Sequence, residues 1–498
     1  MDKRIQKSQT AAEGDQCNRG TDHQGVWGKK AGRKPKEQEP GVNNVGDLIS
    51  VLQHYFPKFT DWLEGLRDFR RPDRIIFQRT VLVLEMILER LCGTDARAHL
   101  TQHRRETVFK QNLETLLGMT LERLPHGDTF AFFFERLDPA ELDRLRGEMI
   151  HVLHKKKILD KCKYRKYYLL AIDGVHLKTS KKPISRSVKV KHSDGRVEYR
   201  QYALEAKLVS PQGPVFSIAS VFIGDDDLNG NADEIKTDSD GKIIAFPKQD
   251  CELKAFKRLT EEIHKKFPKW KFMLLLDGLY MTRTVIDICR QFGWAFSITL
   301  KEGSASNLYQ AAVEKIAQDT HNRIRQKDGS ILKWCNSVPW KSDGKKTYKL
   351  NVIGTANGNS WSFLYATSIF IHKDNAEELQ NEVCRERWKI ENQGFREQKH
   401  CGLALEKAFG TIGFAAQNFY LIVQIAHIIR TLMIHSSLFR TIQRIDSHGI
   451  IKETIRKPML DFFGSIKYFV SSFARSIFSC PLTLRNNQFE RLEFAVTS

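Results

Sequence analysis

Tyr167-Tyr-Leu-Leu-Ala-Ile-Asp-Gly174 is a continuous apolar run that ends in an acidic residue and a glycine. A second run of the same kind, Phe272-Met-Leu-Leu-Leu-Asp-Gly278, follows later in the chain. Short apolar runs without alternation are typical of strands that are buried on both faces of a sheet. We therefore expect two central strands, with Asp173 and Asp277 at their ends.

The segments around these two runs predict the rest of a sheet. A turn is expected at Ser193-Asp-Gly195, before the next strand. Further strands are expected over Tyr199–Leu208, Val215–Ile223 and Ala295–Leu300, and helices over about 250–267 and 282–292. Three strands followed by alternating helices and strands predict an α/β protein with a mixed sheet flanked by helices.

A third stretch, Cys384 to Lys399, has the composition of a helix with basic and aromatic residues around Glu391. On an α-helix, Arg387 and Phe395 share the face of Glu391, and Lys399 lies within about a quarter turn of it. A carboxylate beside basic side chains is what a site needs to bind a metal cation and phosphates. A solvated helix with Arg–Glu pairs four residues apart explains the segment equally well.

The two aspartates also have two interpretations. A single Asp-Gly after a strand is more often just a turn. Carboxylates at the ends of neighbouring buried strands, however, converge on one edge of the sheet and repel each other unless a cation lies between them. Because no His or Cys accompanies Asp173 and Asp277, such a site would favour Mg²⁺ or Mn²⁺.

Composition favours a polyanionic partner. The 498 residues include 79 Lys and Arg against 59 Asp and Glu, a formal net charge of +20, and nucleic acid is the commonest partner of such a protein. The nine cysteines form no Cys-x-x-Cys pair, which argues against a zinc finger or a disulfide framework. The longest apolar segment, Phe419–Ile434, is interrupted by polar residues, so we expect a buried helix, no membrane span and a cytoplasmic protein.

The chain divides into six predicted regions. Residues 1–45 are predicted to form a disordered basic tail whose Gly28–Pro35 resembles an AT-hook, although a solvated tail is the more common explanation of such a segment. Helical spacing predicts a helical DNA-binding domain over 46–165, with breaks at Gly93, at Pro125-His-Gly where Asp128 would cap the next helix, and at Asp138-Pro139. The other regions are 166–300 and 371–440 (the two parts of the sheet domain), a β-rich insertion at 301–370, and a helical C-terminal region at 441–498.

Three short motifs carry a family resemblance. Ala171-Ile-Asp-Gly174, Leu275-Leu-Asp-Gly-Leu-Tyr280 and Arg387-Trp-Lys-Ile-Glu-Asn392 resemble the acidic motifs of the DDE transposases of bacterial insertion sequences. More narrowly, the chain is similar to the cut-and-paste group with a β-rich insertion before the glutamate. The flanks at 248–256 and 299–303 match as well, and the 114 positions between Asp277 and Glu391 (391 − 277) leave room for the insertion.

The resemblance implies an RNase H-like catalytic domain in which Asp173, Asp277 and Glu391 hold two Mg²⁺ or Mn²⁺ ions. It implies cleavage of double-stranded DNA at terminal inverted repeats and joining to target DNA, by a homodimer in the synaptic complex, at the nucleoid. Arg387, Lys399 and Lys301 are the residues then expected to contact DNA.

Two positions depart from the family pattern, which has Tyr where this chain has Cys384 and Lys where it has Gln398. Lys399, one position later, would have to replace that lysine. Other functions stay open: an RNase H-like metal-dependent nuclease, a non-catalytic DNA-binding protein of transposase descent, or a glycosidase with paired carboxylates, which the positive charge disfavours. Trp340 would stack on an extruded base or, more often for such a residue, belong to the core.

Overall fold

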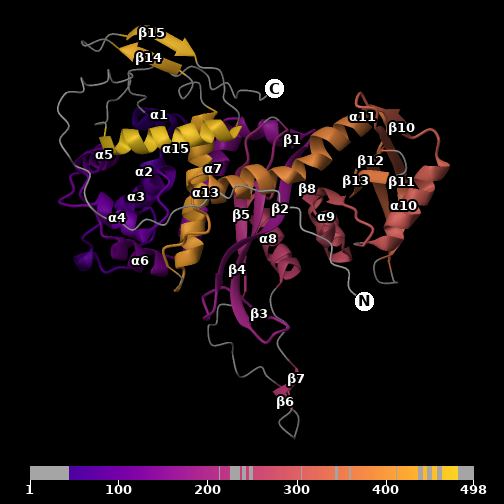
Figure 1. Cartoon of the computed structure of the whole chain (residues 1–498), viewed down its shortest axis with the longest axis horizontal. Helices are drawn as coiled ribbons and strands as arrows, with labels where there is room; N and C mark the ends of the chain where they lie inside the picture. Colours follow the sequence, from indigo (N-terminus) through magenta and orange to yellow (C-terminus); the bar gives the residue numbers. More distant parts are fainter. Residues whose placement is uncertain are drawn as a thin grey trace, which may run out of the picture. The chain divides into compact units, whose positions relative to one another are not determined.

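The apolar run at Tyr167 begins strand β2 (Tyr167–Ser180) of the computed structural model (Figure 1). The structure describes residues 44–211, 213–224, 236–237, 243–245, 251–303, 305–341, 346–357, 360–410, 412–435, 441–445, 451–456 and 462–479. The predicted basic tail, apart from its last two residues, and its AT-hook-like motif lie outside the described residues.

Strand β2 lies at the centre of a mixed sheet. On one side it pairs in parallel with β8 (Phe272–Leu276), which pairs in parallel with β9 (Ala295–Thr299). On the other side it pairs antiparallel with β4 (Val197–Leu208), whose own antiparallel neighbours are β5 (Phe216–Ile223) and β3 (Val188–Lys191). The predicted α/β class, with a mixed sheet flanked by helices, is confirmed.

The prediction that the first strand ends at Asp173 is wrong, because β2 continues to Ser180. Its pairing with β8 extends from Tyr168 to Ala171, whereas its pairing with β4 continues to Ser180. Beyond Asp173 the buried Val175 and Leu177 alternate with more exposed residues. The continuous apolar run therefore marks the length over which the strand has neighbours on both sides, not the whole strand.

The predicted β-rich insertion extends this same sheet. Strand β9 pairs with β13 (Ser360–Thr367), and the order continues through β12 (Thr347–Asn357) and β11 (Ile331–Lys341) to β10 (Arg323–Arg325), all antiparallel. Helix α10 (Ser306–Gln318) packs against β11. Trp340 is buried beside Tyr348, with ring centroids 5.8 Å apart, so the core interpretation of this tryptophan is the one that the structure supports.

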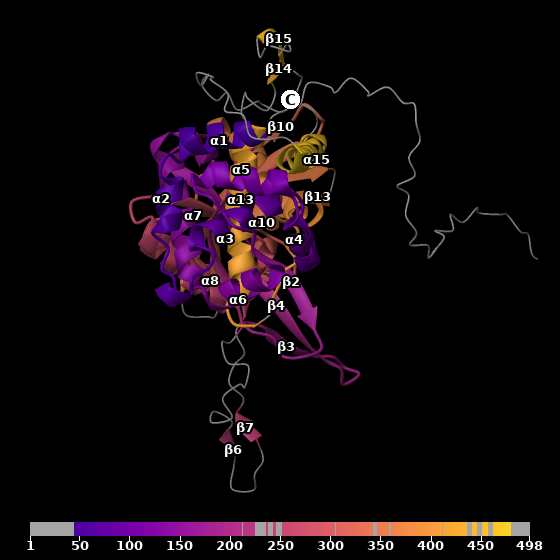
Figure 2. The same ribbon diagram turned by 90° about the vertical axis from the view of Figure 1, so that its left-hand side faces the viewer.

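The N-terminal part of the described chain is helical, as predicted, and surrounds helix α13 (Ala415–Ile434) (Figure 2). Helix α13 is mostly apolar and is buried along nearly its whole length, because it packs against α3, α6, α7 and β5. The helices of this part are α1 (Asn44–Tyr55), α2 (Phe59–Glu64), α3 (Arg79–Leu91), α4 (Arg97–His103), α5 (Thr107–Leu117), α6 (Gly127–Arg136) and α7 (Pro139–Lys155). No described helix is both long and apolar enough to cross a membrane.

Two of the predicted helix starts differ in their caps. Asp138 caps α7 as expected, since its side chain accepts a hydrogen bond from the backbone N–H of Ala140 at 3.0 Å. At α6 the cap is His126, whose Nδ1 accepts from the N–H of Asp128 at 3.2 Å. The prediction that Asp128 caps α6 is wrong because the helix begins one residue before it, at Gly127.

The remaining helices cover the sheet and its edge. They are α8 (Glu252–Lys266), α9 (Arg283–Phe292) and α11 (Lys373–Glu378). Within the described residues of the C-terminal region, α15 (Phe462–Ser479) is a helix, whereas β14 (Thr441–Ile445) and β15 (Ile451–Arg456) before it form a hairpin. The prediction of a wholly helical C-terminal region is therefore wrong. Both hairpin segments are short and rich in Ile and Thr, which favour strands.

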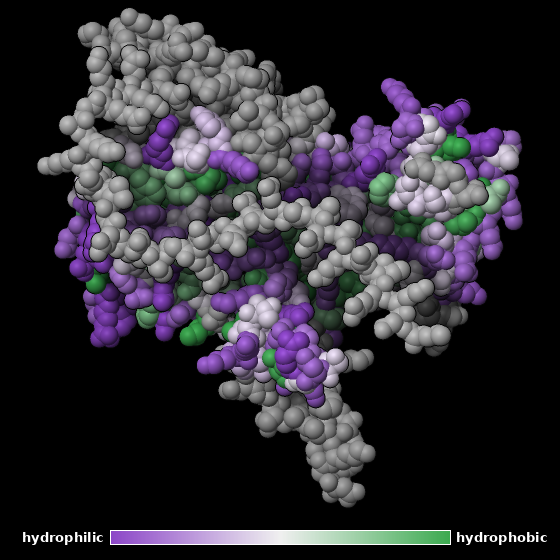
Figure 3. Space-filling view, viewed as in Figure 1, coloured by the Kyte–Doolittle hydropathy of each residue, from purple (hydrophilic) through white to green (hydrophobic). Residues whose placement is uncertain are grey.

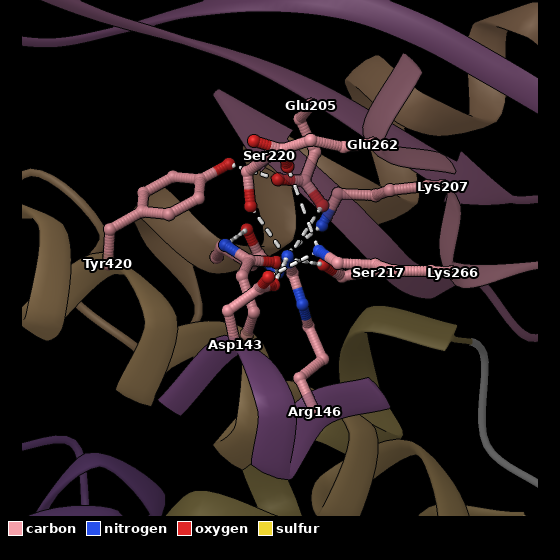
Figure 4. A network of polar contacts seen from close by, with 11 residues as sticks. Asp143, Arg146, Glu205, Lys207, Ser217, Ser220, Glu262, Lys266 and Tyr420 are labelled. Atoms are coloured by element: carbon pink, nitrogen blue, oxygen red, sulfur yellow. Dashed lines mark hydrogen bonds and ion pairs between the residues drawn. The ribbon is translucent and has the colours of Figure 1, made fainter. Parts of the chain in front are cut away.

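A buried polar network joins the helical part to the sheet (Figure 4). Arg146 of α7 donates hydrogen bonds to Ser217 and Ser220 of β5, at 2.8 and 2.6 Å, and lies 4.0 Å from Glu205 of β4. Tyr420 of α13 donates to the same Glu205 at 2.7 Å. The described residues from 44 onward belong to one compact unit, and their hydrophobic core continues across residue 165. Hydrophilic residues predominate on the described surface of the face in Figure 3.

Candidate active site

Asp173 is partly buried in the middle of β2, directly opposite Glu205 of β4. Its Oδ1 accepts a hydrogen bond from the N–H of Gly174 at 2.9 Å, and its Oδ2 lies 3.4 Å from a guanidinium nitrogen of Arg387. Burial raises the pKa of Asp173 to about 7 against the opposing effect of Arg387, and the negative charges of Glu391 and Glu252 add to the increase. The uncharged form of this carboxyl group is therefore favoured by burial more than its charged form is favoured by Arg387.

Arg387 joins Asp173 to the glutamate of the third motif. The guanidinium nitrogen that approaches Asp173 also lies 2.7 Å from Oε1 of Glu391. The shared face predicted for Arg387 and Glu391 is thus confirmed, and Arg387 reaches a strand residue 214 positions away in the sequence. The Arg–Glu pair of the alternative interpretation is therefore present, but its arginine is largely buried: the side chain of Arg387 is 11% exposed and that of Glu391 is 38% exposed.

The segment that carries Glu391 is helical but not a regular α-helix. A 3₁₀ turn, η6 (Cys384–Arg387), is followed by a π-helix, η7 (Ile390–Arg396), and a short α-helix, α12 (Glu397–His400). A Cβ at Gly394 would lie 3.1 Å from Cδ of Lys207, so glycine lets this helix approach β4 closely. Wide turns of this kind are frequent at functional sites. The segment from Cys384 to Lys399 is thus helical as predicted, but the prediction of a regular α-helix is wrong because it contains 3₁₀ and π turns.

Asp277 follows β8 on the strand next to Asp173. Ala171 pairs with Leu275 in the parallel register, and Asp173 and Asp277 each come two positions later. The Asp277 side chain caps a short 3₁₀ turn, η4 (Gly278–Tyr280), by accepting from the N–H of Leu279 at 2.9 Å. Asp277 therefore forms a turn, and it also directly follows the strand that pairs in parallel with the strand of Asp173.

Two further residues of the site were not predicted from the sequence. The hydroxyl of Tyr280 donates a hydrogen bond to Glu252, the first residue of α8. Burial raises the pKa of Glu252, with a further increase from Asp277 and a decrease from the Tyr280 hydrogen bond. Burial and the charge of Glu252 raise the pKa of Tyr280, and Asp173 and Asp277 contribute as well. These effects place Glu252 and Tyr280 among the aspartates.

The other two predicted DNA contacts are Lys399 and Lys301. Lys399 pairs with Glu406 at 2.7 Å, and its charge lowers the pKa of His176, which lies further along β2. Lys301 is exposed just beyond β9. The structure thus brings Arg387 to the carboxylates, whereas Lys399 makes its ion pair elsewhere.

The two departures from the family pattern are both buried. The thiol of Cys384 lies 3.1 Å from the hydroxyl of Ser297, which donates a hydrogen bond to it. Gln398 exchanges hydrogen bonds with Gln424 of α13, and Lys207 donates to the same Gln424 at 2.8 Å. A lysine at 398 would therefore lie in the core beside the buried cation of Lys207.

The donor chemistry of this group suits a hard divalent cation. Asp173, Asp277, Glu391 and Glu252 offer carboxylate oxygens without His or Cys, which is the ligand set of Mg²⁺ and Mn²⁺. In the described residues, no group of three or more His, Cys, Asp or Glu side chains is close enough to hold a metal ion as it stands. Arg387 instead provides the positive charge between Asp173 and Glu391.

The chain was also compared with known proteins. Its sequence matches no model of a protein family and no curated protein. The function is therefore inferred from the residues and the geometry of the site.

The helix of Glu391 is anchored by a second buried ion pair. Glu397 contacts Arg430 of α13 at 2.5 Å and lies 3.3 Å from Nε2 of His427. Although burial opposes it, the charges of His427 and Arg430 lower the pKa of Glu397 to about 2. The buried Lys207 is the other cation on this side, and burial lowers its pKa to about 8.

We predict that this pair makes the protein sensitive to acid. A carboxylate with a lowered pKa stabilises the fold above its unfolded value of 4.5, and that contribution is lost as the pH falls toward 2. Urea unfolding from pH 6 to pH 2 should show Glu397→Gln to be less stable than wild type at pH 6, by about 3 kcal/mol, since Arg430 loses its partner. The difference should narrow as the pH falls; a constant difference would contradict the lowered pKa.

Proposed function

We propose that this protein is a DDE-type DNA transposase, which cleaves the ends of an insertion sequence and joins their 3′-hydroxyl groups to target DNA. The observation that carries the proposal is the shared guanidinium of Arg387, which holds Asp173 and Glu391 together from distant parts of the chain. Asp277 lies on the adjacent parallel strand. These are the three carboxylates for which the motif resemblance implies metal binding.

The sheet and the charge give further support. Strands β2, β4 and β5 pair antiparallel, with the short β3 between β2 and β4 in the sequence. They precede two parallel strands, β8 and β9, each preceded by a helix. This mixed arrangement is compatible with an RNase H-like domain, and the extra strands β10 to β13 occupy the expected position of the insertion. A net charge of +20 favours a phosphate-rich partner.

The chemistry proposed is phosphoryl transfer. Two bound divalent cations would supply a nucleophile activated at neutral pH and charge stabilisation for the leaving oxygen. Asp173, Asp277 and Glu391 would hold them, and Arg387 would orient the two carboxylates that it contacts. Because cleavage and joining need the same groups, one site serves both steps in turn. DNA ends with terminal repeats, target DNA and a second copy of the chain are the partners proposed.

Arg387 provides a prediction that depends on the metal. Its charge is neutralised by Asp173 and Glu391 in the metal-free protein, whereas cations on these carboxylates would release it toward a DNA phosphate. Without metal, log affinity against log salt should run parallel for wild type and Arg387→Ala. With Ca²⁺, which binds carboxylates, the slope for Arg387→Ala should be shallower by about one unit.

Lys399→Ala is the matched control for this experiment. Its ammonium pairs with Glu406 rather than with the carboxylates of the site, so any change in its slope should be the same with and without metal. Parallel lines for Arg387→Ala in both buffers would show that this arginine does not bind phosphate.

The test of the proposed function is metal-dependent cleavage of the DNA that flanks the gene. We expect cleavage at inverted repeats in Mg²⁺ or Mn²⁺, none with a chelator, and poor activity with Zn²⁺, because the site has no soft ligand. Cleavage without any joining would favour the nuclease, and binding without cleavage would favour the non-catalytic DNA-binding protein. Robust cleavage in metal-free buffer would contradict the proposed site.

A further inference from the structure

We propose that Glu252 is a fourth carboxylate of this site and binds the same divalent cations, held in position by the hydroxyl of Tyr280. This inference rests on the proposed function and adds two residues to the three that the motifs supply. The observations that carry it are the position of the Glu252 side chain, the glycine beneath it and its hydrogen bond.

Gly174 shows how closely Glu252 approaches strand β2 at the residue after Asp173. A Cβ at position 174 would lie 3.1 Å from Oε2 and 3.3 Å from Oε1 of Glu252, closer than ordinary van der Waals contact. Gly174 lies inside β2 rather than in a turn, and glycine within a strand often marks the close approach of another group. The group that approaches Gly174 is the carboxylate of Glu252, and Gly174 is the residue after Asp173.

Tyr280, which follows Asp277 in the sequence, holds the Glu252 carboxylate in position. Its phenol is fully buried, packs with its ring 5.2 Å from that of Phe256, and donates its hydrogen bond to Glu252. Tyr280 ends the 3₁₀ turn that Asp277 caps. One hydrogen bond therefore connects the first residue of α8 to the turn that positions Asp277.

The position of Glu252 also has an explanation that involves no metal. An acidic residue in the first turn of a helix is stabilised by the helix dipole, and such a residue is normally solvated. Glu252 is instead partly buried against the strand of Asp173, and within the described residues no base is among the groups that act on its carboxylate. A carboxylate directed at other carboxylates without a basic partner is better explained by a shared cation than by capping.

The experiment measures Mn²⁺ binding to the full-length protein without DNA, from the loss of the electron paramagnetic resonance signal of the free ion. Glu252→Gln keeps the shape and removes the charge, and we expect it to weaken Mn²⁺ binding by about tenfold or more. Tyr280→Phe keeps the ring and should weaken binding several-fold. Glu261→Gln, on an exposed position of the same helix, is the matched control and should bind as wild type does.

The outcomes separate this inference from the proposed function. If wild type and Asp173→Ala bind Mn²⁺ equally, the assignment of the metal site is wrong, and the proposed role of Glu252 is then wrong as well. If Asp173→Ala weakens binding but Glu252→Gln does not, only the fourth carboxylate is wrong. Thermal unfolding of each variant without metal checks the fold: a Glu252→Gln protein that melts with wild type yet binds Mn²⁺ weakly supports the inference.

Discussion

Asp173→Ala, Asp277→Ala and Glu391→Ala should each bind the DNA ends about as tightly as wild type and cleave them at least about a thousandfold more slowly. Binding should persist because it depends mainly on contacts between basic residues and phosphates. Cleavage should fail because metal ions contribute several kcal/mol of charge stabilisation, and each ~1.4 kcal/mol is a factor of ten in rate. Band-shift assays and single-turnover cleavage on the same DNA measure both quantities.

The control for this prediction is Glu205→Gln. Glu205 lies directly opposite Asp173 in the sheet but is bonded to Tyr420 and lies near Arg146, away from the shared guanidinium. It should alter stability and leave the rate of cleavage by the folded protein near that of wild type. A fully active variant at Asp173, Asp277 or Glu391 would refute the assignment of that residue.

Arg146→Ala should destabilise the protein by about 3–5 kcal/mol, because it removes one partner of a buried ion-pair network. The Arg146 side chain is 0% exposed and contacts Asp143, Ser217, Ser220 and Glu205 (Figure 4). Its loss removes the cation that lies 4.0 Å from Glu205, and it leaves Asp143 with Lys266 but without the other of its two cations. Urea unfolding at pH 7 measures the change.

Arg144→Ala is the matched control on the same helix. Arg144 pairs with Glu141 but its side chain is 44% exposed, so its removal should cost no more than about 1 kcal/mol. The double variant Arg146→Met/Glu205→Gln should recover part of the loss, since neither position then carries a buried unpaired charge. Equal stability of Arg144→Ala and Arg146→Ala would contradict a structural role for the network.

Sequence reasoning identified the central strands for a clear physical reason. β8 and the first half of β2 have neighbours on both sides, so their residues are apolar without alternation. The second half of β2 lacks the partner β8 and alternates, which is why the predicted strand stopped at Asp173. The hairpin β14–β15 was missed because strands of five or six residues are too short for periodicity to distinguish from helix.

The site was only partly predictable because its contacts depend on tertiary structure. Helical spacing correctly paired Arg387 with Glu391, but it could not show that the same guanidinium reaches Asp173. Glu252 lies in a segment that resembles the family, yet its role depends on the start of α8 lying over Gly174. The signal available in the sequence was Gly174, which the apolar pattern assigned to the end of a strand.

The central claim is that this site breaks and joins DNA strands, and transfer of a labelled end tests it most directly. Purified protein is incubated with a DNA end from the sequence flanking the gene, labelled and ending in a free 3′-hydroxyl, together with a supercoiled plasmid. We predict that label becomes covalently attached to the plasmid in Mg²⁺, with wild type but with none of Asp173→Ala, Asp277→Ala and Glu391→Ala. Label that never enters the plasmid although wild type binds the end, or that enters it equally with the three variants, would contradict the claim.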